Sequence, residues 1–485
     1  MIDKGYFGDN CSAIVIGKNA TTTGHVLLAH GEDDPRCFVQ SHLVPHMTHK
    51  EGEMLSWEDG RALIPQLPET LGFYWSEYRM IGGGEPFADM FFNECGVAVV
   101  SNAMGGSKIP EGSDPLDLGG IGYGMRRLIA ERATSARHAV EVVAELMEKY
   151  GYRSSRTYTV ADKDEAWSIQ LTTGNQFAAR RIGDDEVYYT PNWYTIHELD
   201  FNNPDVNRFS PDVVKYAIDN GWYTPAREGD YSDFDFGRVY QGAEWNHISN
   251  RLRSDLAWSH LLDGEPLPYQ TFSTKAAKKY APADLKKILR LHYDGWEEDL
   301  KEDPKTGPHR YGICRDTTVE SDVFEFADLP ELTVIWRAFP RPCVSPYTPW
   351  FGGITKLPEG YEWYGPNASL RSHFASDDRE FKYDASLAYW AFRTLQNVME
   401  FDYRFCEDMV HGEIAEMEKE WDLIIPEIRK AYRTLKAVDE KAARVLLDDF
   451  TAAAAHKAWR WAQAMTQKLY DAKDQANMDF WRSKL

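Results

Sequence analysis

Two apolar runs near the start of the chain are separated by a segment of turn-forming residues. Cys11–Gly17 (CSAIVIG) is rich in β-branched residues, which favours a strand, and residues 25–29 (HVLLA) form the second run. The intervening residues 18–24 (KNATTTG) are typical of a turn. We therefore predict a β-hairpin that ends at the acidic cluster of residues 32–34.

The next part of the chain predicts a strand, two helices and a series of strands. The apolar run 96–100 indicates the strand, and residues 116–133 are expected to be helical. In the second helix, residues 135–150, apolar residues recur at three- and four-residue spacing, with Ser135 placed to cap its start and Gly151 its end. Short apolar runs separated by polar turns then predict an antiparallel meander of four strands, at residues 158–160, 167–169, 177–179 and 187–189.

The second half is less regular before it becomes helical. Residues 200–310 are aromatic and charged and show few periodic segments, and strand patterns return at 321–326 and 333–338. From about residue 385 to residue 480 the pattern is helical. This order of elements predicts a layered α+β fold with mainly antiparallel sheets.

Composition excludes several classes of protein. The 485 residues include 54 Lys and Arg against 76 Asp and Glu, a net charge of −22, which argues against a nucleic-acid partner. Hydrophobic residues make up 43% of the chain, too many for a disordered protein. No apolar run is long enough to span a membrane or to act as a secretory signal, so we expect a cytoplasmic protein without a membrane partner.

The common short motifs of catalysis are missing. The six cysteines are scattered without a CxxC pair, and the 14 histidines show no HExxH, so we expect neither a metal nor a cofactor. There is no GxSxG nucleophile motif. The glycine runs at 82–84 and 120–124 lack the features of a phosphate-binding loop.

Cys11 supports two interpretations. A single cysteine that opens an apolar strand is commonly a small buried core residue. Alternatively, cleavage of the Asn10–Cys11 bond would give one residue both a thiol and a free α-amine. An α-amine has an ordinary pKa of about 7.7–8.0, so it can serve as general base for the thiol without a partner histidine.

Short segments across almost the whole chain follow one another in a specific order. They are residues 11–18 (CSAIVIGK), 29–33 (AHGED), 93–98 (NECGVA), 131–133 (ERA), 135–137 (SAR), 165–167 (EAW), 190–192 (TPN) and 199–201 (LDF), then Leu329, Pro330, Trp336, Pro346 and Pro349. In this order and spacing the chain resembles the cysteine dipeptidases of the dipeptidase A type. These belong to the N-terminal-nucleophile (Ntn) hydrolase superfamily, with secernins, penicillin V acylases and bile salt hydrolases as relatives.

The resemblance implies a four-layer αββα sandwich of mainly antiparallel sheets with a helical C-terminal region. It also implies that residues 1–10 are a leader, removed autocatalytically to expose Cys11. Residues 11–485 would then form a single Ntn-hydrolase domain, which replaces the three domains that length alone suggests.

The resemblance also implies roles for individual residues. Asp33 matches the acid that binds the amine of the nucleophile, Asn102 matches a position near the oxyanion, and Asn192 matches an asparagine whose side-chain N–H donates to the oxyanion. Arg315 is a candidate for a positive group near the thiol or the substrate carboxylate. As alternatives, Asp33 could be a solvated turn acid, and the two asparagines could be turn or cap residues.

His30 departs from the family pattern, in which this position usually carries arginine. Histidine is shorter than arginine and is partly charged at neutral pH, so the change could alter thiol activation or substrate choice. We include His30 with Arg315 among the candidate substrate-binding residues.

The sequence therefore predicts a cysteine Ntn hydrolase that cleaves the amide bonds of short peptides through a thioester at Cys11. We expect a small peptide as substrate and a homo-oligomer in solution. Two alternatives stay open: an amidase or acyltransferase for N-acyl compounds, and a non-catalytic protein similar to secernins. Retention of the leader and the presence of His30 would favour the non-catalytic protein.

Overall fold

The structure is a computed structural model. It describes residues 11–34, 37–55, 62–80, 90–110, 112, 116–243, 247–262, 264, 267, 270–293, 309, 311–363, 365, 368, 370, 373 and 377–484. The predicted leader, residues 1–10, lies outside these ranges.

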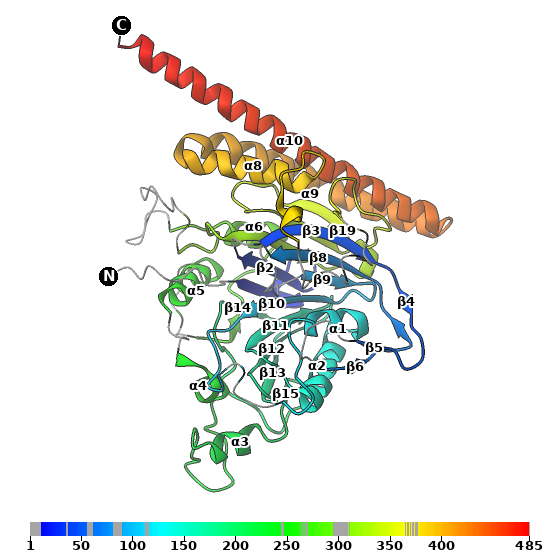
Figure 1. The fold of residues 1–485 in the computed structure, drawn as a ribbon, viewed down its shortest axis with the longest axis vertical. Coiled ribbons are helices and arrows are strands. Elements are labelled where there is room, and N and C mark those ends of the chain that lie inside the picture. The colour runs from blue at the N-terminus through cyan, green and yellow to red at the C-terminus, as the bar shows by residue number, and fades with distance from the viewer. Residues whose placement is uncertain are drawn as a thin grey trace.

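Two large antiparallel sheets form the centre of the described part of the chain (Figure 1). The first has seven strands in the order β16 (Ser273–Lys275), β14 (Glu186–Thr190), β1 (Ser12–Ile16), β2 (Leu27–Asp33), β17 (Thr318–Glu325), β18 (Val334–Ala338) and β19 (Thr348–Phe351). The second has eight strands in the order β15 (Asn207–Phe209), β13 (Phe177–Ile182), β12 (Ala166–Leu171), β11 (Arg156–Ala161), β10 (Ala98–Ala103), β9 (Met90–Asn93), β8 (Phe73–Met80) and β3 (Cys37–Val44). Two short ribbons pair β4 (Met47–Thr48) with β7 (Glu69–Thr70) and β5 (Met54–Leu55) with β6 (Ile64–Pro65).

Helices cover the outer faces of both sheets. The pair α1 (Met125–Arg132) and α2 (Ala136–Tyr150) packs on the eight-stranded sheet, while α5 (Ile248–Leu261) and α6 (Pro282–Leu289) pack on the seven-stranded sheet. The two sheets contact each other through β1 and β10 and through β17 and β3. The molecule is therefore the four-layer αββα sandwich that we predicted.

Three long helices follow this sandwich: α8 (Ala388–Phe401), α9 (Tyr403–Lys436) and α10 (Glu440–Arg482). Figure 1 shows them stacked at one end of the molecule, where α10 contacts β19 and α8 contacts β3. Both strands are edge strands, so the helices cover backbone groups that would otherwise be open to pairing. This confirms the helical C-terminal region. No helix in the described part of the chain is both long and apolar enough to cross a membrane.

The predicted hairpin forms the centre of the seven-stranded sheet. β1 pairs with β2 in the register that places Ser12 opposite Gly31, and all five residues of β1 are buried. The strand is followed by Gly17, where an added Cβ would lie 2.2 Å from the carbonyl oxygen of Gly183. The absence of a side chain at position 17 therefore lets the turn before β14 approach β1.

Three expectations are corrected. Of the four strands predicted for the meander, only β11, β12 and β13 are neighbours, because the fourth, β14, crosses to the other sheet and pairs with β1. The helix expected from residue 116 starts at Met125, because Gly119 and Gly120 have positive φ values of 87° and 67°. Residues 200–310 contain more structure than their pattern suggests, including α3 (Val213–Asp219), α4 (Phe236–Tyr240), α5 and α6.

The cap predicted for α2 is present. The Ser135 side chain accepts a hydrogen bond from the backbone N–H of His138 at 3.1 Å. We expect Ser135→Ala to lower the free energy of unfolding by about 1 kcal/mol, because the donor loses its partner. Urea unfolding of the purified protein measures this change, and an unaltered midpoint would contradict the role of the cap.

Candidate active site

Cys11 lies directly before β1 and is fully buried. Its thiol donates a hydrogen bond to Glu32 Oε2 at 3.1 Å, and its carbonyl oxygen accepts one from Arg253 Nη1 at 2.6 Å. Glu32 belongs to the neighbouring strand β2, and Arg253 belongs to α5 on the outer face of the same sheet. A residue of the neighbouring strand thus holds the thiol of Cys11, and a residue of the packed helix holds its carbonyl oxygen.

The surroundings keep the thiol neutral. Burial raises the pKa of Cys11, and the carboxylates of Glu32 and Asp33 raise it further. A hydrogen bond from the backbone N–H of Ala103 acts in the opposite direction but does not outweigh them. Because the thiolate is the nucleophilic form, Cys11 needs a nearby base to react.

Asp33 is buried at the end of β2 and is not a solvated turn acid. Its Oδ1 accepts a hydrogen bond from the Thr318 hydroxyl at 2.5 Å, and its Oδ2 lies 4.0 Å from Arg315 Nε. Burial raises the pKa of Asp33 to about 7, although the charges of Arg315 and Arg253 lower it in part.

This raised pKa makes the stability of the leader-bearing chain depend on pH. Folding moves the Asp33 pKa from its ordinary 3.8 to about 7, so the folded state keeps a proton that the unfolded chain has lost. Stability therefore falls as pH rises from about 4 to about 7, by at most about 4 kcal/mol at 1.36 kcal/mol per pKa unit. We expect Asp33→Asn to flatten this slope, since asparagine does not ionise.

Urea unfolding at pH 5 and pH 8 measures the slope. Both proteins compared should carry Cys11→Ala, so that no α-amine forms beside Asp33. Equal pH slopes with and without Asp33→Asn would contradict this prediction.

The two predicted asparagines lie on either side of the junction between the sheets. Asn102 is in β10, and its Nδ2 donates to the carbonyl oxygens of Thr190 and Pro191 at 3.2 and 3.1 Å. Asn192 follows β14, and its Nδ2 donates to the Ala103 carbonyl oxygen at 2.8 Å. Both side chains therefore tie one sheet to the other beside Cys11. The Asn102 amide holds the end of β14 by donating to the carbonyl oxygens of Thr190 and Pro191.

Sequence reasoning missed Arg253, which connects most of this site. Its guanidinium donates to the Cys11 carbonyl and the Ser12 hydroxyl, and also to the side-chain oxygens of Asn192 and Asn250 at 2.7 and 2.8 Å. The side chain is fully buried. Arg253 and Asn250 both lie in α5, a helix that the sequence pattern did not predict. A basic residue in that segment gives no sign that its side chain reaches Cys11.

His30 is buried next to the thiol and is not partly charged as expected. Its Nε2 lies 3.1 Å from the Ser101 carbonyl oxygen and 4.0 Å from Glu32 Oε2. Burial lowers the pKa of His30 to about 3, and the charges of Arg126 and Arg156 lower it too. His30 is therefore neutral at pH 7, and positive charge in this part of the site comes from arginines.

Arg126 and Arg156 supply part of that charge. Their Nη1 atoms lie 3.2 and 3.4 Å from the hydroxyl of Ser101, which belongs to β10 of the facing sheet and whose carbonyl oxygen contacts His30. Arg315 approaches from the other side and donates to the Ser249 hydroxyl at 2.6 Å. The structure thus places Arg315 beside Asp33, with its Nε 4.0 Å from the carboxylate.

Two groups of described residues bring metal-ligating atoms together. Cys11, His30 and Glu32 form the first group. There the Cys11 thiol donates a hydrogen bond to the Glu32 carboxylate, so we treat this group as the site of a thiol and not of a metal. The second group lies elsewhere: His292, His309, Cys314 and Cys343.

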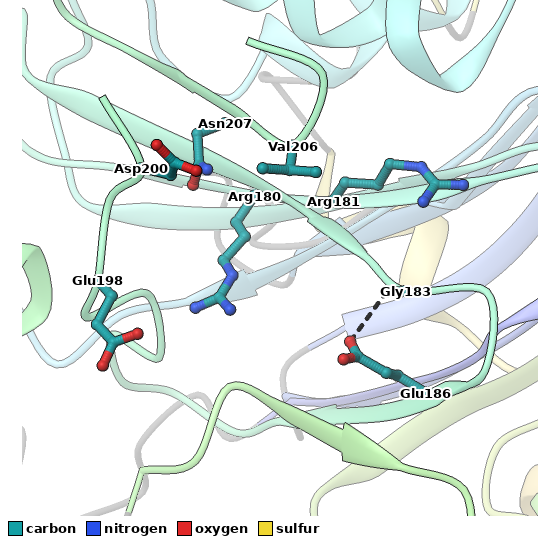
Figure 2. A pocket seen from close by; sticks show the side chains of 8 residues that line it. All are labelled: Arg180, Arg181, Gly183, Glu186, Glu198, Asp200, Val206 and Asn207. Atoms are coloured by element: carbon teal, nitrogen blue, oxygen red, sulfur yellow. Dashed lines mark hydrogen bonds between the residues drawn. The ribbon is translucent and has the colours of Figure 1, made fainter. Parts of the chain in front are cut away.

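A surface pocket of about 290 Å³ lies at the far end of β1 from Cys11 (Figure 2). Its lining residues are Arg180, Arg181, Gly183, Glu186, Glu198, Asp200, Val206 and Asn207. Ile16, the last residue of β1, pairs with Val187, the neighbour of Glu186. The five residues of β1 span about 16 Å, so this pocket is separate from the thiol.

The comparisons with known proteins define the family. The described part of the chain is a sandwich of two antiparallel sheets with a buried cysteine directly before a central strand. The model of the family described as Peptidase family C69 matches residues 10–416. The chain belongs to peptidase family C69 and is a peptidase.

Curated relatives are similar over most of the chain. "Probable dipeptidase B" of Streptococcus pyogenes serotype M6 is 23% identical over 491 residues, which cover 96% of this chain and 93% of that protein. "Probable dipeptidase" of Latilactobacillus sakei is 23% identical over 418 residues, 81% of each chain. Among solved structures, a mutant of the conjugated bile acid hydrolase from Clostridium perfringens gives a TM-score of 0.34 at 10% identity, covering 68% of this chain and 89% of that one. That structural similarity is too low to support a statement about this chain.

Proposed function

We propose that this peptidase is a dipeptidase that uses Cys11 as an N-terminal nucleophile. The observation that carries the proposal is the position of Cys11 at the start of β1, between Glu32 and Arg253 and one residue after the predicted leader. The names of the relatives, probable dipeptidases, support the choice of substrate.

Removal of residues 1–10 would supply the missing base. The freed α-amine takes the thiol proton as the sulfur attacks the scissile carbonyl carbon, so that a C–S bond forms and the carbonyl oxygen becomes an oxyanion. Collapse of this intermediate breaks the C–N bond, and the ammonium returns its proton to the departing amine. Water then hydrolyses the thioester and restores the thiol.

The surrounding residues suit these steps. Asp33 follows Glu32, the partner of the thiol, at the end of β2 and would hold the new ammonium group. The Ala103 backbone N–H and the second N–H of the Asn192 amide are donors for the oxyanion. Arg315 offers a positive charge to a substrate carboxylate, which a short peptide always carries.

Intact-mass measurement and a substrate panel test the proposal. We expect the purified active protein to begin at Cys11 and to hydrolyse dipeptides faster than N-acyl amides such as penicillin V. Full activity with residues 1–10 still attached would overturn the Ntn mechanism. A preference for N-acyl amides would favour the amidase alternative. An uncleaved protein whose Cys11 resists a thiol-directed electrophile would favour the non-catalytic one.

A further inference from the structure

Four side chains that bind metals well meet at a place that the peptidase chemistry does not use. His292 follows α6, His309 and Cys314 precede β17, and Cys343 lies in the connection from β18 to β19. One donor atom from each lies within 4.8 Å of every other. His309, Cys314 and Cys343 are all at least 97% buried, and His292 is partly buried.

We propose that His292, His309, Cys314 and Cys343 bind a structural zinc ion. Two thiolates and two imidazoles form the donor set that selects zinc in a tetrahedral site. Four protein ligands leave no open position, which marks the site as structural rather than catalytic. The proposal is independent of the mechanism at Cys11.

The distances fit such a site. Zn–N bonds of about 2.0–2.1 Å and Zn–S bonds of about 2.3 Å place tetrahedral ligands about 3.3–3.8 Å apart. His309 Nε2 lies 3.3 Å from Cys343 Sγ, and the two imidazole rings are perpendicular, with centroids 4.6 Å apart. The Nε2 atom of His292 is buried without a hydrogen-bond partner among the described residues. Movements of about 1 Å would complete the tetrahedron.

Neighbouring groups hold the ligands in place. His411 Nε2 lies 3.0 Å from the Cys343 carbonyl oxygen, and the Tyr403 ring packs edge-on against His309. A zinc ion with two thiolates is neutral, and the charge of Arg341 is balanced by Glu400 at 2.5 Å. The site therefore needs no further counter-ion.

A bound zinc ion would be linked to the active site through two consecutive residues of the chain. Cys314 is followed directly by Arg315, which bonds to Ser249 and lies 4.0 Å from Asp33. Cys343 belongs to a different connection, so the ion would fix the segment that carries Arg315 to the edge of the seven-stranded sheet. The four ligands are spread from residue 292 to residue 343, which is why their spacing predicted no metal site.

Elemental analysis of the full-length protein, purified without added metal or chelator, tests the proposal. We expect about one zinc per chain, and less than about a tenth of that in Cys343→Ser and in His309→Ala. The matched control is Cys37→Ser, which changes another buried cysteine outside the cluster and should keep its zinc.

A second measurement covers variants that fail to fold. Wild-type protein stripped of zinc and reloaded with cobalt should show thiolate-to-cobalt charge transfer and the intense visible bands of tetrahedral coordination. Four outcomes would overturn the proposal: wild-type protein without metal, a Cys314–Cys343 disulfide that lowers the mass by two hydrogens, an octahedral cobalt spectrum, or zinc retained in Cys343→Ser.

Discussion

Cys11→Ala is expected to abolish peptide hydrolysis and to leave residues 1–10 attached. Alanine supplies neither a nucleophile for the substrate nor one for the cleavage that would free the α-amine. Loss of a covalent nucleophile commonly costs at least about 10³-fold in kcat, and here the general base is lost with it. Kinetics on a dipeptide and the intact mass of the same preparation measure both effects.

Two variants make this result specific. Cys95→Ala changes a cysteine in the turn after β9, outside the site, and should lose residues 1–10 as the wild type does and keep wild-type activity. Cys11→Ser keeps a nucleophile of lower reactivity, so it separates removal of the leader from hydrolysis of the substrate. Cleavage of the leader with little dipeptidase activity would show that the chemical step limits the rate of dipeptide hydrolysis. If Cys11→Ala kept more than about a tenth of wild-type activity, the assignment of the nucleophile would be wrong.

Local signals explain which parts of the fold could be predicted from sequence. The hairpin of β1 and β2 and the cap of α2 depend on neighbouring residues, and both are observed as predicted. The pairing of β14 with β1 joins segments that are distant in the sequence. An apolar run predicts a strand but does not indicate which sheet that strand joins. The short strands β4–β7 depend on such distant partners as well.

The same distinction applies to the site. Cys11 and Asp33 belong to the hairpin, so the family pattern could be carried over to them directly. Glu32 neighbours Asp33 in sequence, yet strand alternation turns the two side chains in different directions, and only the structure shows which one the thiol contacts. Arg253 reaches Cys11 from α5, which the sequence pattern did not reveal.

The position of His30 illustrates how charge can be supplied from elsewhere. A neutral imidazole does not supply the positive charge that the family resemblance led us to expect at this position. Arg126 of α1 and Arg156 of β11 bond to the Ser101 hydroxyl, and the Ser101 carbonyl lies beside His30, so positive charge is present next to the neutral ring. This arrangement weakens the argument that His30 marks a non-catalytic protein.

Arg253→Met is expected to lower kcat by about 10²–10³-fold with a small effect on KM, because Arg253 positions the nucleophile and Asn192 without reaching the substrate. Removing a buried cation also leaves its acceptors without a donor, so we expect a loss of stability of about 3 kcal/mol. Arg253→Lys keeps the charge but not the forked geometry, and should recover stability more than kcat.

The control for this effect is Arg251→Met on the exposed side of the same helix, which should leave both kcat and stability nearly unchanged. Thermal unfolding and dipeptide kinetics on the four proteins separate positioning from folding. If Arg253→Lys restored stability and kcat in parallel, Arg253 would act only through the fold. A large KM increase with unchanged kcat would instead place its guanidinium on the substrate, since only direct substrate contacts alter binding without altering the chemical step.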